Sequence, residues 1–286
     1  MGLGTHAVRK VPVNDRFQID LQALQAAISA DLQAGLHPVC VVGGAGTVNT
    51  GAIDDLEALA DICRQHGLWF HVDGAFGALA YLSLQFRPML TGIECADSLA
   101  FDLHKWMYMP YDISCILVRN EAEHRLAFTL TPHYLSQAER GLAAMSYSPS
   151  DYGPELSRGF RALKVWMSLK AHGVHKYSRL VQQNVEQARY LASLIDNEPR
   201  LERLAPVPLN IVCLRYVVPG LDQDELDRLN RELLIHLQES GVAVPSQTVL
   251  SGNFALRAAI TNHRSRWEDF DLLVRQVIRI GDELNG

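Results

Sequence analysis

The first 120 residues alternate between short, continuously apolar runs and segments with apolar residues at helical spacing. A helix is predicted over residues 54–66, which Asp54 can cap at its start and Gly67 can end. Because the apolar runs are continuous rather than alternating, they are typical of parallel strands in a sheet that is covered on both faces. The predicted strands are residues 38–43, 68–73, 97–101 and 113–118.

The pattern changes after residue 129. Residues 129–154 are rich in Ser, Gly, Pro and Tyr and have no regular period, which predicts a long loop of the functional kind. We expect a larger α/β domain over residues 1–163 and a small α+β domain over residues 164–286. The elements predicted beyond the loop are helices at 158–172, 176–195, 222–240 and 265–284 and strands at 209–217 and 254–260.

Composition narrows the classes of function. Hydrophobic residues make up 48% and charged residues 20%, and the net charge of −6 disfavours a nucleic-acid binder with a broad basic face. The five cysteines include no CxxC pair, which favours free thiols in a reducing compartment. His172 and His175 share a helical face without a third ligand, so no metal site is expected. The first ten residues contain no secretory apolar region, and we expect a cytoplasmic protein.

Side chains that can take part in binding or catalysis follow two of the predicted strands. Asp73 ends one strand, and His104 and Lys105 come just after another. Ligands of open α/β sheets collect at the carboxyl ends of strands, where both segments lie. Each residue alone also has a purely structural explanation. Asp73 can cap a loop, Lys105 can be a solvated surface lysine, and His104 can be a core histidine whose ring nitrogens are hydrogen-bonded.

Together the two segments form a recognisable pattern. HVDGAFG at 71–77, followed by DLHKW at 102–106, resembles the pyridoxal 5′-phosphate (PLP) dependent group II decarboxylases, which include the aromatic-L-amino-acid, histidine and glutamate decarboxylases. The resemblance spans nearly all 286 residues and implies the C-terminal part of a fold-type I, aspartate aminotransferase-like large domain with a mostly parallel sheet, followed by a small α+β domain. The other similar segments are GTVNTGAIDDL at 46–56, PHYL at 132–135, SRGFRALKVWMSLKAHG at 157–173 and FALRAAITNHRS at 254–265.

The resemblance implies roles for the strand-end residues. Lys105 would form the Schiff base with the PLP aldehyde, which requires its neutral amine. Asp73 would face the pyridine nitrogen and keep it protonated, so that the ring accepts the electrons left when CO₂ departs. Ala75 would lie under the ring, and His104 would hold the phosphate or orient Lys105.

The resemblance also implies two residues that act on the substrate. Tyr134 matches the loop tyrosine that protonates the substrate carbon after decarboxylation; the alternative is a loop aromatic that packs on the surface. Arg257 matches an arginine near the substrate carboxylate; the alternative is a structural ion pair. The substrate would be an L-amino acid, and the family implies a homodimer or pairing with a longer relative.

Three departures from the family pattern stand out. Asp102 occupies a position where relatives carry an asparagine that binds phosphate, and Val48 replaces a threonine found in some relatives. The sequence also begins at a segment that lies well inside the large domain of the family. We therefore expect a truncated chain without the Gly/Ser-rich phosphate cup, a serine-bearing helix start of the kind that binds phosphate. An exposed apolar face is expected where such a segment would pack.

These observations leave alternatives open. The first is a PLP-dependent decarboxylase whose chain is incomplete. The second is a non-catalytic, truncated paralogue that associates with a partner chain. The third is another fold-type I lyase that uses PLP. The loop with Tyr134 and the His-Lys-Trp context favour decarboxylation over the third, whereas the sequence does not separate the first from the second.

Overall fold

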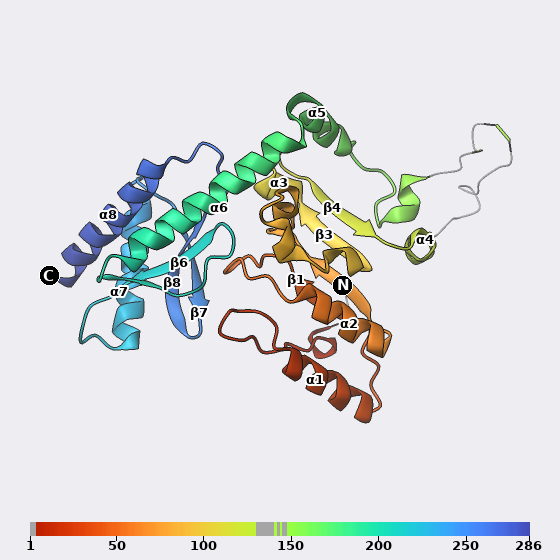
Figure 1. The fold of residues 1–286 in the computed structure, drawn as a ribbon, viewed down its shortest axis with the longest axis horizontal. Helices are drawn as coiled ribbons and strands as arrows, with labels where there is room; N and C mark the ends of the chain where they lie inside the picture. Colours follow the sequence, from red (N-terminus) through yellow and green to blue (C-terminus); the bar gives the residue numbers. More distant parts are fainter. Residues whose placement is uncertain (1–3, 130–139, 142–143, 145–147) are drawn as a thin grey trace.

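Two four-stranded sheets organise the chain (Figure 1). The computed structural model describes residues 4–129, 140–141, 144 and 148–286. In the first sheet, β1 (Cys40–Gly44), β2 (Trp69–Asp73) and β3 (Ser98–Asp102) are parallel, and β4 (Ser114–Val118) runs antiparallel to β3. The second sheet is antiparallel, in the order β5 (Leu201–Arg203), β6 (Ile211–Tyr216), β8 (Asn253–Ala259) and β7 (Ser246–Leu250). The predicted fold class, a mostly parallel sheet plus a separate α+β unit, is confirmed.

A helix lies at each of the five predicted positions, but the helices at residues 21–33, 103–106 and 121–128 were not predicted, and the predicted helix cap is wrong. Asp55, not Asp54, caps the helix at residues 56–66 by accepting a hydrogen bond from the Ala58 amide. Gly67 ends this helix in the left-handed region, as predicted. The α-helices are α1 (Leu21–Gln33), α2 (Leu56–His66), α3 (Leu103–Trp106), α4 (Glu121–Phe128), α5 (Ala162–His172), α6 (Val174–Asp196), α7 (Gln223–Glu239) and α8 (Trp267–Asn285).

Asp54 instead connects two segments of the chain through its buried carboxylate. Its carboxylate is buried and accepts hydrogen bonds from the Gly44 amide at 2.6 Å and the Ile19 amide at 2.7 Å. Burial raises the pKa of Asp54 despite these two hydrogen bonds. The side chain thus ties the end of β1 to the segment before α1.

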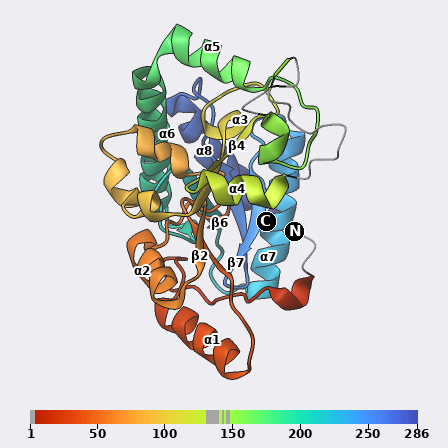
Figure 2. The same cartoon turned by 90° about the vertical axis from the view of Figure 1, so that its right-hand side faces the viewer.

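Helix α6 joins the two halves of the molecule. Figures 1 and 2 show it as a long helix that runs from α5 to the second sheet. Val181 and Val185 belong to the core cluster of the first sheet, whereas Leu191 and Ile195 belong to that of the second. The domain division after residue 163 stays a prediction.

One face of the first sheet is open, so the prediction of cover on both faces is wrong for this chain. Val41 and Phe70 lie on the covered face and share a core with Leu59 of α2. Val42 and Ile116 lie on the opposite face by strand alternation and register, and their side chains are 50% and 51% exposed. The reason is that α2 packs on only one side of the sheet. Exposed apolar side chains thus lie on this face, whereas the packing of a further segment against it stays a prediction.

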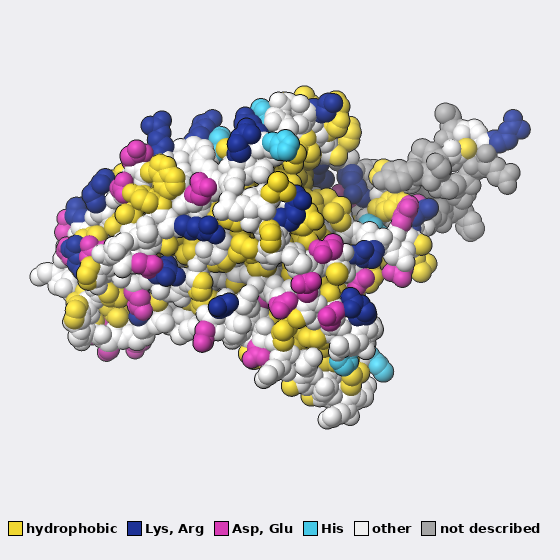
Figure 3. Space-filling view, in the orientation of Figure 1, with side chains coloured by type: hydrophobic (Ala, Val, Ile, Leu, Met, Phe, Trp, Pro, Cys, Tyr) yellow, Lys and Arg dark blue, Asp and Glu magenta, His cyan; other side chains and the backbone are white. Residues whose placement is uncertain are grey.

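Helix α5 adds further exposed apolar surface. Figure 3 shows hydrophobic side chains gathered over this helix, and Trp166 and Met167 are mostly exposed.

Within the described part of the chain, no helix is both long enough and apolar enough to cross a membrane.

Two glycines allow the loops after β1 and β2 to approach each other. Gly46 has a φ of +83°, and a Cβ there would lie 2.5 Å from the Gly77 Cα. We expect Gly46→Ala to lower the free energy of unfolding by about 2 kcal/mol or more beyond the loss in Gly220→Ala. Gly220 is the control because its φ is +94° and a Cβ would meet nothing within 4 Å. Equal losses in urea unfolding of the two variants would show that the close approach contributes nothing.

Candidate active site

The two acidic strand ends lie at the same edge of the first sheet. Asp73 is the last residue of β2, and Asp102 is the last residue of β3. In the parallel register Asp73 pairs with Ala100, two residues before Asp102. Both carboxylates therefore belong to the open face, because side chains alternate along a strand. The structure thus brings the two segments predicted from sequence to one sheet edge.

Asp73 keeps part of its hydrogen-bonding capacity. The side chain is exposed, and its Oδ1 accepts from the Ala75 amide at 3.0 Å. Among the described residues, its Oδ2 has no hydrogen-bond donor. Ala75 itself is partly exposed beside this carboxylate. An acceptor with a free oxygen next to a small side chain suits a planar ligand that carries an N–H donor.

Lys105 lies in the single-turn helix α3, just beyond β3. Its Nζ is 2.6 Å from Asp102 Oδ2, and 35% of the side chain is exposed. Ser114 on β4 donates its hydroxyl to the other oxygen of Asp102. Burial alone would raise the pKa of Asp102, but the hydrogen bonds from Lys105 and Ser114 lower it overall. The carboxylate that replaces the expected asparagine thus binds the lysine.

Ser114 was not found from the sequence. The antiparallel pairing of β4 with β3, seen only in the structure, sets Ser114 opposite Asp102. An apolar run gives the position of a strand but not its pairing register.

His104 is fixed by the backbone. Its Nδ1 lies 2.8 Å from the Ile113 carbonyl and 3.1 Å from the Ile113 amide nitrogen. The Tyr111 ring lies beside it, with centroids 4.4 Å apart. These contacts favour the predicted orienting role over a phosphate contact through Nδ1.

Arg257 approaches from the second sheet. Its Nε donates to the Val48 carbonyl at 2.6 Å and its Nη1 to Ser246 Oγ at 3.0 Å. Its guanidinium lies 5.8 Å from the ring centre of Phe76, and burial lowers its pKa. Arg257 therefore reaches the loops that follow β1 and β2. Tyr134 lies outside the described residues.

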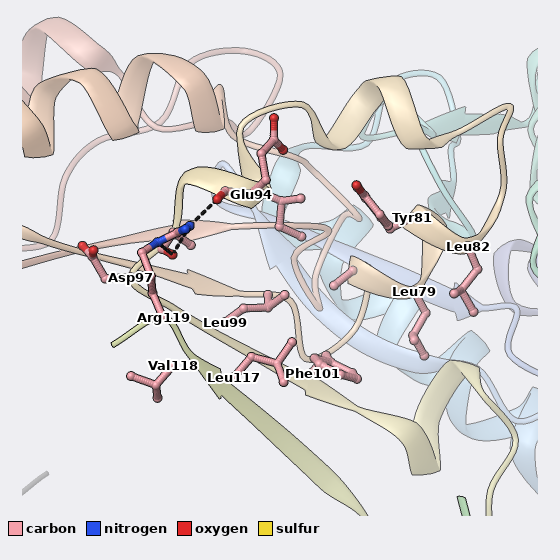
Figure 4. Close-up of a pocket in the computed structure, with 13 residues that line it drawn as sticks. Leu79, Tyr81, Leu82, Glu94, Asp97, Leu99, Phe101, Leu117, Val118 and Arg119 are labelled. Atoms are coloured by element: carbon pink, nitrogen blue, oxygen red, sulfur yellow. Dashed lines mark hydrogen bonds between the residues drawn. The ribbon is translucent and has the colours of Figure 1, made fainter. Parts of the chain in front are cut away.

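A separate apolar cleft of about 510 Å³ opens on the other face of the sheet (Figure 4). Leu99 and Phe101 line it, and these residues alternate with Ala100 and Asp102 along β3. Arg119 closes one end by donating hydrogen bonds to the backbone carbonyls of Glu94 and Ala96. The cleft therefore takes no part in the strand-end site.

The strand-end residues fit the ring end of PLP. The Lys105 side chain is partly exposed and carries the amine that would meet the cofactor aldehyde, although this amine is paired with Asp102 in the structure. The free Oδ2 of Asp73 suits a protonated pyridine nitrogen. This arrangement fits an enzyme that binds a carbonyl cofactor through a lysine side chain.

The comparisons with known proteins agree with this class. Residues 2–217 match the family described as the pyridoxal-dependent decarboxylase conserved domain, so the chain belongs to that family. The aromatic-L-amino-acid decarboxylase of Bacillus atrophaeus is 32% identical over 100% of this chain and 59% of the relative. Tyrosine decarboxylase 4 of Petroselinum crispum is 33% identical over 86% of this chain and 49% of the relative.

Solved structures show the same fold. The crystal structure of Oryza sativa TDC with PLP and tryptamine matches with a TM-score of 0.92 and 27% identity, over 99% of this chain and 59% of that one. The chain thus spans about half to three-fifths of the length of these relatives. The family match and the PLP-bound neighbour support PLP as the cofactor.

The ion pair of Asp102 has a pH signature. The pKa of Asp102 is lower in the folded protein than in the unfolded chain, where it is about 4. The ionised carboxylate therefore stabilises the folded protein above pH 4, and this stabilisation is lost as pH falls through the folded pKa. We expect Asp102→Asn to lower stability in urea at pH 7 and to lose this effect as pH falls below 4. Asp61→Asn, which breaks the exposed pair with Arg64, is the control. A pH-independent difference for Asp102→Asn would contradict the assignment.

Proposed function

We propose that the protein is a PLP-dependent carboxy-lyase that decarboxylates an L-amino acid, with Lys105 as the residue that binds the cofactor aldehyde. One observation carries the proposal: the partly exposed side chain of Lys105 follows β3 at the sheet edge where Asp73 has a free carboxylate oxygen. Family membership supports it, because the matched family is described as pyridoxal-dependent decarboxylases.

Each residue of the site has a task in this proposal. When bound, PLP supplies an electron-accepting ring that stabilises the negative charge left as CO₂ departs. Asp73 accepts the hydrogen of the pyridine nitrogen and holds that proton in place. Ala75 leaves space beside the ring, and His104, held at Ile113, orients the turn that carries Lys105.

Two further residues act on the substrate in this proposal. Arg257 would bind the substrate carboxylate from the side of the second sheet, since it already reaches the loop at Val48. Tyr134 would donate the proton that replaces the lost carboxylate. The relatives named for aromatic and tyrosine decarboxylation support an aromatic L-amino acid as the substrate class.

Association through the open sheet face is also part of the proposal, with a homodimer or a longer relative as the partner. The face is apolar at Val42 and Ile116, and exposed apolar surface of this kind favours association. The free state of all five cysteines supports a cytoplasmic location.

Self-association can be measured directly. We expect the chain to elute earlier than a monomer in size exclusion at high concentration, and Ile116→Ser to shift this transition to higher concentration. Leu126→Ser on α4 is the control, because Leu126 is 84% exposed and lies off the sheet. A monomer at every concentration would overturn association of the chain with itself.

The proposed activity is tested by incubating the full chain with PLP and single L-amino acids. Equal amounts of CO₂ and amine, formed only with PLP, would support decarboxylation. PLP bound at Lys105 without CO₂ release would contradict decarboxylation and favour another PLP-dependent lyase. Absence of PLP binding would favour the non-catalytic paralogue.

A further inference from the structure

A buried hydrogen-bond network begins directly after Lys105. The indole Nε1 of Trp106 donates to Oδ1 of Asn184 at 3.1 Å, and the Tyr108 hydroxyl donates to the same oxygen at 2.6 Å. Trp106 and Asn184 are both 0% exposed. Asn184 lies on α6, so this contact bridges 78 positions of sequence.

The amide nitrogen of Asn184 continues the network into the C-terminal half. It donates to Oε1 of Gln187 at 3.1 Å and to the Asn262 carbonyl at 3.2 Å. Gln187 in turn donates to the Ser265 carbonyl at 2.6 Å. Asn184 therefore uses two acceptor and two donor positions, which is the full capacity of its amide.

The turn that carries Lys105 depends on such external contacts. Helix α3 has four residues, and Asp102 at its start makes no capping hydrogen bond to it. One helical turn contributes little stability of its own, so tertiary contacts set its position. His104 is held at Ile113 on one side of Lys105, and Trp106 is held at Asn184 on the other.

We propose that Asn184 is a positioning residue for Lys105, which it holds through Trp106 and Tyr108 while its amide nitrogen binds the segment between β8 and α8. The proposal rests on the proposed function in one respect, namely that Lys105 is the lysine that reacts with PLP. Trp106 belongs to the core of the first sheet, and the network extends from it to the segment between β8 and α8.

Asn184→Ala tests the proposal against a matched control. Asn230→Ala is the control because Asn230 is also 0% exposed and uses both ends of its amide, on Tyr216 and Leu226 in the second core. Both variants are expected to lose stability. Only Asn184→Ala is expected to slow PLP incorporation at Lys105, by about tenfold or more, because small displacements of a reacting group are costly.

A second readout does not require PLP. Reductive methylation with ¹³C-formaldehyde labels the amines of the five lysines and of the N-terminus, and the loss of one signal in Lys105→Ala identifies that of Lys105. We expect the Lys105 signal to shift in Asn184→Ala and to stay unchanged in Asn230→Ala. Tyr108→Phe removes one hydroxyl donor to Asn184 and keeps the aromatic ring and its contacts. It is expected to give a smaller shift in the same direction, and it replaces Asn184→Ala in the test if that variant does not fold.

The outcomes separate the two proposals. A shift of the Lys105 signal without PLP incorporation in the unmodified chain would support positioning and contradict the proposed function. An unchanged Lys105 signal in both Tyr108→Phe and a folded Asn184→Ala would overturn the positioning role, even where stability falls as much as in Asn230→Ala.

Discussion

Lys105→Ala is expected to abolish the PLP adduct and any CO₂ release while leaving the fold intact. Lys105 supplies the amine at the strand-end site, and its side chain is 35% exposed, so its loss removes the reacting group without opening the core. The measurement is visible absorption after PLP addition, together with CO₂ release from an L-amino acid. Far-ultraviolet circular dichroism checks the fold.

Lys164→Ala provides the matched control. Lys164 is a half-buried lysine on α5 whose Nζ donates to the Tyr111 carbonyl at 3.2 Å, outside the strand ends. Its loss is expected to leave the adduct unchanged. An undiminished adduct in Lys105→Ala would point to another lysine and undo the assignment.

Asp73→Asn is expected to lower the rate of decarboxylation by about 100-fold or more while PLP still reacts with Lys105. The asparagine has nearly the same shape, but it lacks the negative charge that holds a proton on the pyridine nitrogen. Loss of one such electrostatic contact in a site commonly costs factors of this size. The measurement is single-turnover CO₂ release at saturating PLP.

Asp61→Asn is the control for this substitution, since Asp61 is an exposed carboxylate on α2 that pairs with Arg64. It is expected to leave the rate unchanged. A rate for Asp73→Asn within about threefold of the unmodified chain would mean that Asp73 does not face the ring nitrogen.

Many strands and helices could be predicted because each is specified by the pattern of apolar residues and glycines within its own segment. Continuous apolar runs gave β2 and β3 within one or two residues, and Gly67 marked the end of α2. The cap was misplaced because Asp54 and Asp55 are equivalent in sequence, and only burial against Gly44 distinguishes them. The short edge strands β5 and β7 were missed, since their residues carry no apolar run.

The site was predicted as a set of residues but not as a network. Asp73 and Lys105 stand out because polar residues that follow apolar strands are unusual, and the structure brings them to one edge. Ser114 and Asn184 gave no such signal, because their partners depend on strand register and on the position of α6. Long-range pairings of this kind cannot be read from local spacing. The proposed roles of all six site residues stay predictions: Asp73, Ala75, His104, Lys105, Tyr134 and Arg257.

The most direct test of the account is borohydride reduction of the full chain after PLP addition, followed by peptide mapping of the labelled lysine. The chain has five lysines, so the label has four alternative positions. The account predicts about one label per chain, on Lys105, with the label lost in Lys105→Ala. Label spread over several lysines, or a label on another single lysine, would contradict the claim that Lys105 at the end of β3 binds the cofactor.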